Sequence, residues 1–366
     1  MYNSMVMKLL HTADVHIGAG FKGLGARGKE QRKQLKETFK KVIDAAMSEK
    51  VDVVLISGDL FDSNNQGQAE IDFVVDQFKK LEGKSIPVCL IGGTHDYIGP
   101  NSVLRKCVSP DNVHLLSEEK QFAKFDDLDL TVYGVSLTSN KGRKSPLKNF
   151  PSDSRSKFNV GMVHGSFDTG QVDRDDWVFS ASEIESTGLD YLACGHWHSY
   201  FEIPTKKVKA AYSGSPELIA IDQKDSGNVV MAEIGDKVRI EKLKVGKRRH
   251  EKIVLDADVD TLKKELSKKA HPDLIMDVEI RGLKNIETKI DLADWEDKFF
   301  RIRVKDNSHV KLDEIDPSKY PENVTIGKFV RSMKERIDGS SEEEKAVAEE
   351  ALQLGVALLS GKEVLK

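Results

Sequence analysis

Five apolar, strand-like runs in this 366-residue chain each end in aspartate, histidine or both. Helix-like segments, with apolar residues at helical spacing, follow the first two runs. The polar residues at the five exits are Asp14, His16, Asp59, His95, His164, His196 and His198. Because open α/β sheets place their ligand sites just beyond the carboxyl ends of strands, we expect these side chains to converge in space. The pattern predicts an α/β protein built around one polar site.

The residue types at this site favour metal chemistry. Imidazole and carboxylate ligands without thiolate suit Mn²⁺, Fe²⁺ or Zn²⁺, and seven such side chains are too many for one ion. Two ions are therefore predicted, with a carboxylate bridging them. Such a pair generates a hydroxide nucleophile near neutral pH and clamps the attacking and leaving oxygens at phosphorus. The sequence thus predicts hydrolysis of a phosphate ester.

The order of these residues resembles the calcineurin-like metallophosphoesterases. Their pattern of Asp-x-His, Gly-Asp-x-x-Asp, Gly-Asn-His-Asp, a later His and Gly-His-x-His is matched in order across residues 8–200. Three longer strings, LHTADVHIG at 10–18, SGDLFD at 57–62 and YSGSPE at 212–217, are similar to the Mre-eleven and SbcD nucleases of DNA double-strand-break repair. The resemblance implies a two-sheet sandwich flanked by helices, a smaller α+β capping domain and a C-terminal helical pair.

The resemblance also implies roles for the site residues. One metal would be held by Asp14, His16, Asp59 and His198, and the other by Asp59, Thr94, His164 and His196. Asp59 would bridge the two, and His95 would protonate or steady the leaving oxygen. Both ions would be Mn²⁺, with Mg²⁺, Fe²⁺ or Zn²⁺ as alternatives. Thr94 stands where the family has Asn, so a weaker hydroxyl ligand replaces a carbonyl oxygen and we expect weaker binding of the second metal.

Charge and composition limit the kinds of partner that the chain is expected to bind. A net charge of −4 argues against a general polyanion binder, but a basic stretch runs from Lys22 to Lys41. We expect Arg27, Lys29 and Arg32 within it to contact DNA; a solvated helix face is the alternative. No apolar run is long enough to span a membrane, and Met1–Met5 carries no export signal. We therefore expect a cytoplasmic protein without membrane contact.

The chain is longer than the roughly 250 residues at which single cores usually split. We expect a nuclease domain at 1–246, an α+β capping domain at 250–322 and C-terminal helices at 323–366. In the family the helical pair docks on the coiled-coil base of a partner ATPase of the Rad-fifty or SbcC type, and the nuclease forms a homodimer. Packing of the two helices on the cap is the alternative for this chain.

We therefore expect an Mn²⁺-dependent DNA nuclease, exonuclease or endonuclease, that serves as the nuclease subunit of a double-strand-break repair complex. Two alternatives stay open. One is a phosphoesterase of the same superfamily that acts on small substrates. The other is a DNA-end binding scaffold whose activity is weakened by Thr94. Metal-dependent turnover separates an enzyme from a scaffold.

Overall fold

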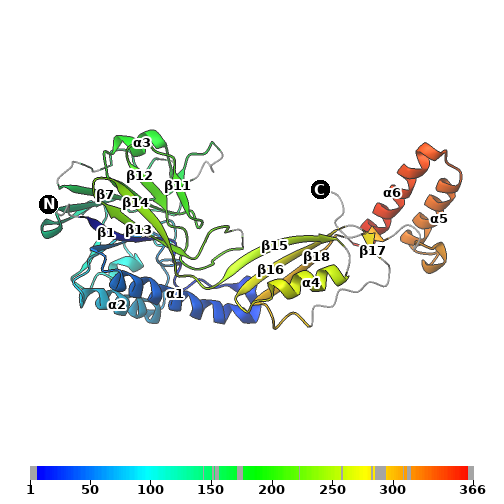
Figure 1. Ribbon diagram of the computed structural model, residues 1–366, viewed down its shortest axis with the longest axis horizontal. Helices are drawn as coiled ribbons and strands as arrows, with labels where there is room; N and C mark the ends of the chain where they lie inside the picture. Colours follow the sequence, from blue (N-terminus) through cyan, green and yellow to red (C-terminus); the bar gives the residue numbers. More distant parts are fainter. Residues whose placement is uncertain are drawn as a thin grey trace. The chain divides into compact units, whose positions relative to one another are not determined.

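The computed structural model describes residues 6–142, 144–150, 152, 156–170, 176–221, 223–256, 259–281, 283–284, 294–307, 309–310 and 315–361. The chain divides into two compact units, Met1–Arg249 and His250–Lys366, which are described separately below. Two six-stranded sheets lie in the first unit, and a three-stranded sheet lies in the second (Figure 1). Among the described residues, no helix is both long enough and apolar enough to cross a membrane.

The first sheet has the strand order β14-β13-β1-β2-β3-β4. Its parallel strands are β1 (Met7–Thr12), β2 (Val53–Ser57), β3 (Val88–Ile91) and β4 (Val113–Leu115). An antiparallel hairpin joins beside β1, formed by β13 (Asn228–Ile234) and β14 (Val238–Lys244). All five residues of β2 are buried, as expected for a continuous β-branched run inside a parallel sheet.

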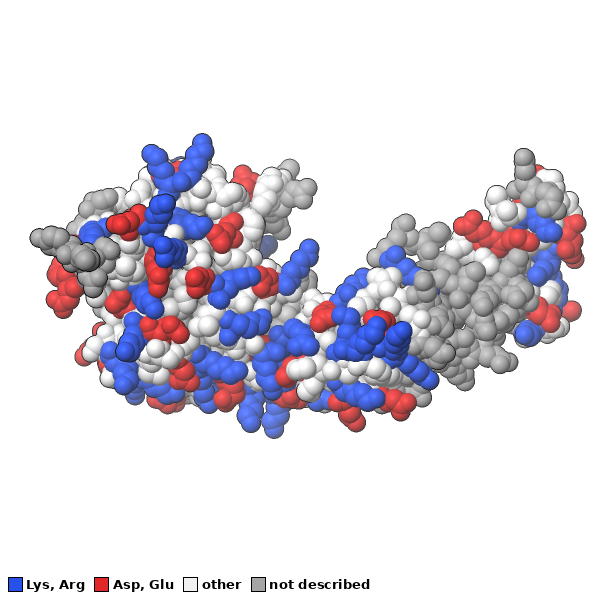
Figure 2. Space-filling view, in the orientation of Figure 1, with Lys and Arg blue, Asp and Glu red and all other residues white. Residues whose placement is uncertain are grey.

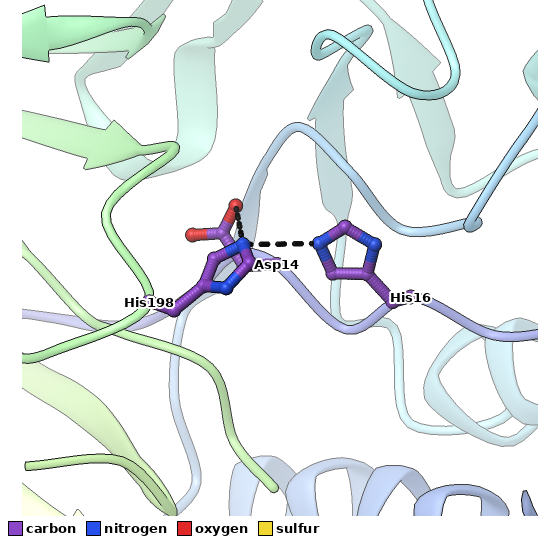
Figure 3. Close-up of side chains that lie close together, drawn as sticks. All are labelled: Asp14, His16 and His198. Atoms are coloured by element: carbon purple, nitrogen blue, oxygen red, sulfur yellow. Dashed lines mark hydrogen bonds and ion pairs between the residues drawn. The ribbon is translucent and has the colours of Figure 1, made fainter. Parts of the chain in front are cut away.

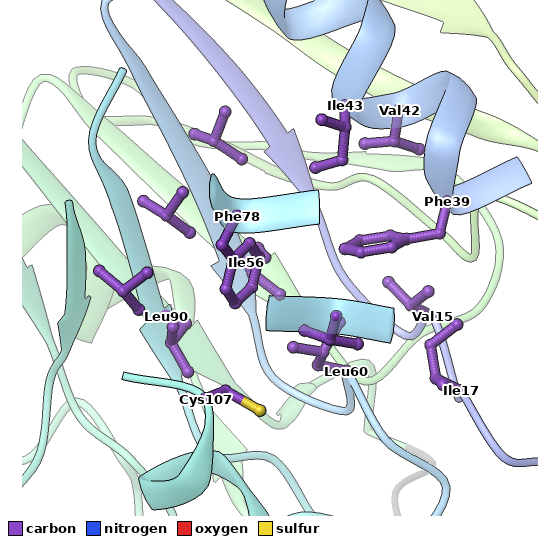
Figure 4. Packing of buried hydrophobic residues seen from close by; sticks show 14 of the residues in the cluster. Val15, Ile17, Phe39, Val42, Ile43, Ile56, Leu60, Phe78, Leu90 and Cys107 are labelled. Carbon is purple, nitrogen blue, oxygen red and sulfur yellow. The ribbon is translucent and has the colours of Figure 1, made fainter. Parts of the chain in front are cut away.

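Two long helices cover the outer face of the first sheet. They are α1 (Gly28–Ser48) and α2 (Gln68–Glu82). Their apolar stripes pack on the strands, with Phe39 and Ile43 from α1 and Phe78 from α2 against Ile56 and Leu90 (Figure 4). Burial of these stripes holds the helices on the sheet, so the loops between strand and helix are fixed at one edge.

The second sheet has the order β11-β12-β10-β7-β6-β5. Its strands are β5 (Phe122–Phe125), β6 (Leu130–Gly134), β7 (Phe158–His164), β10 (Tyr191–Gly195), β11 (Phe201–Ile203) and β12 (Lys209–Tyr212). The four inner strands are parallel and the two edge strands are antiparallel. The sheets face each other across a common core that includes Leu9, Leu55, Met162 and Ala193. The predicted two-sheet α/β sandwich is confirmed.

Shorter elements complete the first unit. A helix, α3 (Ala181–Ser186), begins at a capping box formed by Ser180 and Glu183 and packs on the outer face of the second sheet. The remaining pieces are β8 (Ser166–Phe167), β9 (Val178–Phe179) and the 3-10 helices η1 (Lys22–Arg27), η2 (Val103–Lys106) and η3 (Asp126–Leu128). The segment Val103–Lys106 is thus a short 3-10 turn and not an α-helix.

The second unit has two small cores. Its sheet, of order β15-β16-β18, is formed by β15 (Arg249–Asp256), β16 (Leu274–Arg281) and β18 (Arg301–Asp306). This sheet packs on α4 (Val259–Lys269) through residues such as Leu266 and Met276. A separate core joins α5 (Thr325–Asp338) to α6 (Glu342–Leu359), as the expected helical pair. The short strands β17 (Leu283–Lys284) and β19 (His309–Val310) pair with each other and flank β18 in sequence. The 3-10 helix η5 (Pro317–Lys319) precedes α5.

Candidate metal centre

The predicted site residues follow strands of both sheets. In the first sheet, β1 leads to Asp14 and His16, β2 to Asp59, and β3 to Thr94 and His95; in the second, β7 ends in His164 and β10 leads to His196 and His198. Three groups of these side chains bring ligand atoms within 4.8 Å of one another. They are Asp14 with His16 and His198, His16 with Asp59 and His95, and Asp59 with His164 and His196. The convergence expected from the strand exits is present, and it lies where the two sheets meet.

Backbone geometry at the site is strained in a way that aims these side chains. Asp14, His16 and Asp59 have φ values of 53, 53 and 51°, and His196 has 107°. Positive φ is uncommon outside glycine and costs on the order of 1–3 kcal/mol, so the surroundings must hold it in place. They do so through hydrogen bonds between the exits: His16 N donates to the Asp59 carbonyl at 3.0 Å, and His196 N donates to the Asp14 carboxylate at 3.1 Å.

Two glycines allow the loops to come this close. A Cβ at Gly93 would overlap the Asp59 carboxylate, and a Cβ at Gly195 would overlap the Ser57 carbonyl. Any larger residue at either position would push a strand exit away from the site. The glycines thus have a packing role here that is independent of substrate.

The first set of side chains is Asp14, His16, Asp59 and His198. The Nε2 atoms of His16 and His198 lie 3.2 Å apart (Figure 3). Around them, His16 Nε2 is 3.9 Å from Asp59 Oδ2, and His198 Nε2 is 4.0 Å from Asp14 Oδ1. Two imidazole nitrogens thus face each other between two carboxylates, an arrangement suited to one shared cation.

The second set shares Asp59 with the first. His164 Nε2 lies 3.2 Å from Asp59 Oδ2, and the Thr94 hydroxyl donates to the same oxygen at 3.1 Å. The other carboxylate oxygen, Oδ1, accepts from the backbone N–H of His95 at 2.7 Å. Asp59 is 1% exposed and belongs to two of the three groups, the one with His16 and His95 and the one with His164 and His196.

Neighbouring groups fix which ring nitrogen faces the centre. The Nδ1 atom of His164 lies 2.9 Å from the Ser57 carbonyl, so it carries the proton and Nε2 keeps its lone pair. In the same way, the Asp62 carboxylate accepts a hydrogen bond from His16 Nδ1 at 3.1 Å. Among the described residues, the buried Nε2 of His164 makes no hydrogen bond, because the Asp59 oxygen 3.2 Å away has no proton to donate. A buried polar atom left in this way is costly unless a ligand completes it.

The charges of the site also fit a cation. Burial lowers the pKa of His164, but the nearby Asp59 carboxylate outweighs it and raises that pKa to about 9. Burial raises the pKa of Asp59, but His164 and the other rings outweigh it, so the pKa lies below the usual range. The Asp59 carboxylate therefore stays ionised and favours positive charge on the His164 ring. A divalent cation supplies that charge with the rings neutral, so the donor set fits divalent metal ions.

Three further aspartates form hydrogen bonds with residues of the site. The pattern of strand exits did not predict these roles. Asp96 is fully buried and accepts from the N–H groups of Asp59, Phe61 and Gly93 at 3.1, 3.1 and 2.8 Å. Asp62 orients His16, and its carbonyl accepts from His95 Nδ1 at 2.9 Å. Both lie in the family strings, which was the only signal for them. Asp176 contacts His196 and had no signal in the sequence.

His95 is exposed at the mouth of the site. Its ring centroid lies 4.7 Å from that of His16, and the bond from its Nδ1 to Asp62 leaves Nε2 available. A pocket of about 570 Å³ opens beside it. The lining residues are Asp62, Ser63, Asn64, Thr94, His95, Tyr97, Asn140, Lys141, Asp176 and His196.

The basic residues predicted to contact DNA lie at the start of α1. Lys and Arg side chains lie along this helix with Asp and Glu among them (Figure 2). Arg27 pairs with Glu30 at 3.3 Å, and Arg32 donates to the Gly20 carbonyl at 2.7 Å, whereas Lys29 is exposed. Both arginines therefore have partners within the protein.

The sequence model of the calcineurin-like phosphoesterases matches residues 7–200, which include four strands of each six-stranded sheet and every predicted residue of the site. The chain belongs to this family. Family membership makes this phosphoesterase a metal-dependent hydrolase, in agreement with the donor sets above.

Individual relatives of this phosphoesterase include an uncharacterized metallophosphoesterase, YhaO of Bacillus subtilis, which is 30% identical over 220 residues. That match covers 58% of this chain and 53%, about half, of YhaO. The DNA double-strand break repair protein Mre11 of Sulfolobus acidocaldarius is 26% identical over 279 residues, covering 71% of this chain and 69% of that protein. Among solved structures, the calcineurin-like phosphoesterase YfkN from Bacillus subtilis gives a TM-score of 0.39 at 9% identity, covering 66% of this chain and 91% of that chain.

Proposed function

We propose that this phosphoesterase is a DNA nuclease that acts in double-strand-break repair. The observation that carries the proposal is the extent of the likeness to Mre11 of Sulfolobus acidocaldarius. That likeness covers 71% of 366 residues, about 260, which is more than the 249 residues of the first unit. It therefore continues into the second unit, past residue 200, where the match to the phosphoesterase family ends.

In this proposal two Mn²⁺ ions occupy the site. The first is held by Asp14, His16, Asp59 and His198, and the second by Asp59, Thr94, His164 and His196. Asp59 shares one group of close ligand atoms with His16 and another with His164 and His196, which supports its role as the bridge. When bound, the two cations supply a water nucleophile near neutral pH and withdraw charge from the phosphate oxygens. Mg²⁺, Fe²⁺ and Zn²⁺ are the alternatives, since their ligand preferences overlap.

His95 delivers a proton to the leaving oxygen of the DNA strand in this proposal. Its Nδ1 proton is held by the Asp62 carbonyl, and its Nε2 is the atom available to the pocket. Exposure of the ring supports this role, because the leaving group must reach it from solvent.

The proposal also covers partners. Arg27, Lys29 and Arg32 contact the DNA backbone, and α5 with α6 docks on an SMC-like ATPase of the Rad50 type. Support for the docking comes from three exposed apolar side chains of α6, Val347, Leu358 and Leu359, which are 68, 46 and 44% exposed. A homodimer acting in the cytoplasm completes the proposal.

The experiment compares labelled single-stranded and double-stranded DNA with a small phosphodiester, in Mn²⁺ and in chelator. We expect Mn²⁺-dependent cleavage of DNA, lost in Asp59→Asn together with most Mn²⁺ binding measured by calorimetry. Asp76→Asn, at an exposed position of α2, is the matched control and keeps both. Cleavage of the small diester without cleavage of DNA would favour a small-substrate phosphoesterase. Binding of DNA ends without turnover of either would favour a scaffold.

A further inference from the structure

The ring of His196 is held at Nε2, whereas the rings of His16 and His164 are held at Nδ1. Its Nε2 atom lies 3.2 Å from the Oδ2 atom of Asp176. His164 is held through Nδ1 by a backbone carbonyl, whereas His196 is held by a carboxylate that is 16% exposed. No strand exit delivers Asp176; it lies just before β9.

Asp176 is itself fixed in place. The Ser166 hydroxyl donates a short hydrogen bond to its Oδ2, and the Trp177 N–H donates to its Oδ1 at 2.7 Å. Ser166 in turn accepts from Trp197 Nε1 at 3.3 Å. Pairing of β8 with β9 keeps Ser166 near Asp176, so a rotation of the carboxylate away from His196 would break its bond to the Ser166 hydroxyl.

The stacked rings of Trp197 and Tyr212 connect the Asp176 carboxylate, through Ser166, to the residues that follow β7 and β10. The ring of Trp197, which lies between His196 and His198 in the chain, stacks on Tyr212 with centroids 4.7 Å apart and an interplanar angle of 12°. The Tyr212 hydroxyl donates to the Gly165 carbonyl at 2.7 Å. A continuous set of contacts therefore joins the residue after His164 to the turn that carries His196.

We propose that Asp176 is a positioning residue that orients His196 toward the second metal. It takes the proton on Nε2, so Nδ1 keeps the lone pair that faces the metal. This inference rests on the proposed metal centre. Within the described residues, Asp176 belongs to none of the three groups whose ligand atoms lie within 4.8 Å of one another, so it acts through His196 and not as a ligand.

The identity of Thr94 explains why such a carboxylate matters in this chain. Thr94 offers only a hydroxyl, and that hydroxyl already donates to Asp59. A carboxylate on the outer nitrogen of a ligating imidazole makes the ring a stronger donor, and loss of such a partner typically costs 10- to 100-fold in metal affinity. Asp176 thus strengthens His196 at the metal for which Thr94 is the weak ligand.

The test is Mn²⁺ calorimetry on the full, metal-free chain. We expect Asp176→Asn to weaken the second binding event about 10- to 100-fold and leave the first unchanged. Asp168→Asn, an exposed aspartate whose side chain accepts from the Gly170 N–H, is the matched control and changes neither event. In a Thr94→Asn background the loss caused by Asp176→Asn becomes smaller, because a stronger ligand reduces the dependence on His196.

Nitrogen-15 spectra of histidine in the Zn²⁺-loaded chain give a readout that a purely structural role would not change. We expect Nδ1 of His196 to be the coordinated atom; coordination through Nε2 overturns the proposal. Equal weakening of both metals by Asp176→Asn, with a lower melting temperature, also overturns it. If Asp59→Asn leaves Mn²⁺ binding intact, the metal centre itself fails. If Asp59→Asn abolishes binding and Asp176→Asn binds like the wild type, only the role of Asp176 fails.

Discussion

The Nε2 atoms of His16 and His198 lie 3.2 Å apart, although the two residues are 182 positions apart in the chain. His16 follows a strand of the first sheet and His198 follows a strand of the second. Two neutral imidazoles that meet nitrogen to nitrogen can share only one proton, so a cation between them would satisfy both lone pairs.

Replacing Thr94 by Asn should raise Mn²⁺ affinity at the second position. The longer side chain offers a carbonyl oxygen in place of a weak hydroxyl ligand, and we expect a gain of roughly tenfold, by comparison with the usual loss of a supporting ligand interaction. Cleavage should rise at limiting Mn²⁺ and change little at saturation. The check is rate against Mn²⁺ concentration. An unaltered curve would place Thr94 outside the coordination sphere.

His95→Ser should reduce turnover by about 100-fold or more, the usual scale for loss of a general acid. Mn²⁺ and DNA binding should stay near normal, because the two sets of proposed ligands do not include His95. His271→Ser, in the second unit, is the control. His95 also lies within reach of His16 and Asp59, so loss of a metal in His95→Ser would make it a ligand and refute the acid role.

Exchanging Arg27, Lys29 and Arg32 for Gln should make DNA affinity less sensitive to salt. Each phosphate contact on duplex contributes about −0.9 to the slope of log affinity against log salt, so three contacts account for about −2.7. The control exchanges Lys79, Lys80 and Lys84, which are exposed at and just after the end of α2. If the first variant keeps the wild-type slope, the basic stretch is a solvated helix face and not a DNA contact.

His11 should make the first unit sensitive to acid. Burial lowers its pKa from 6.5 to about 3, against a hydrogen bond to the Cys194 carbonyl that raises it. The unfolded chain therefore binds a proton below pH 6.5 that the folded chain rejects until about pH 3. The free energy of unfolding should fall as the pH drops through this window, by about 2 kcal/mol at pH 5 from this group.

Urea unfolding in chelator at pH 8 and pH 5 measures this effect. His11→Gln keeps a side chain able to bond the Tyr191 hydroxyl, which lies 2.8 Å from His11 Nδ1, but does not titrate. The variant should lose about 2 kcal/mol less than the wild type between the two pH values. Equal losses would mean that His11 is protonated in the folded protein.

Much of this fold was predictable because, along the first 200 residues, apolar strand-like runs are regularly followed by polar residues and by helix-like segments with one apolar stripe. The β-branched run before Asp59 is a buried strand, and the stripe of α1 that carries Phe39 and Ile43 is its cover. The convergence of the strand exits followed from the same pattern. The division of these strands between two sheets did not follow from the pattern, because a parallel strand has the same kind of local sequence in either sheet. The two-sheet arrangement was expected only from the family resemblance.

Contacts that depend on tertiary structure were not predictable. Asp176 reaches His196 through the pairing of β8 and β9, each of two residues, which is too short to leave a periodic signal. Two of the three backbone bonds to Asp96, from Asp59 and Phe61, depend on the loops after β2 and β3 lying side by side. Which side chains bind metal, and whether His95 delivers a proton, stay predictions until they are measured.

Because residues from both sheets form the site, the site cannot assemble early during synthesis of the chain. A nascent chain that has emerged through His95 carries Asp14 and Asp59, but the partners at His164, His196 and His198 arrive only later. Strand β1 also waits for β13, its neighbour in the finished sheet. Neither a fragment released early nor a chain cut between His95 and His164 holds a full set of donors. In the proposed metal centre, hydrolysis would therefore need a chain that has been synthesised at least as far as His198.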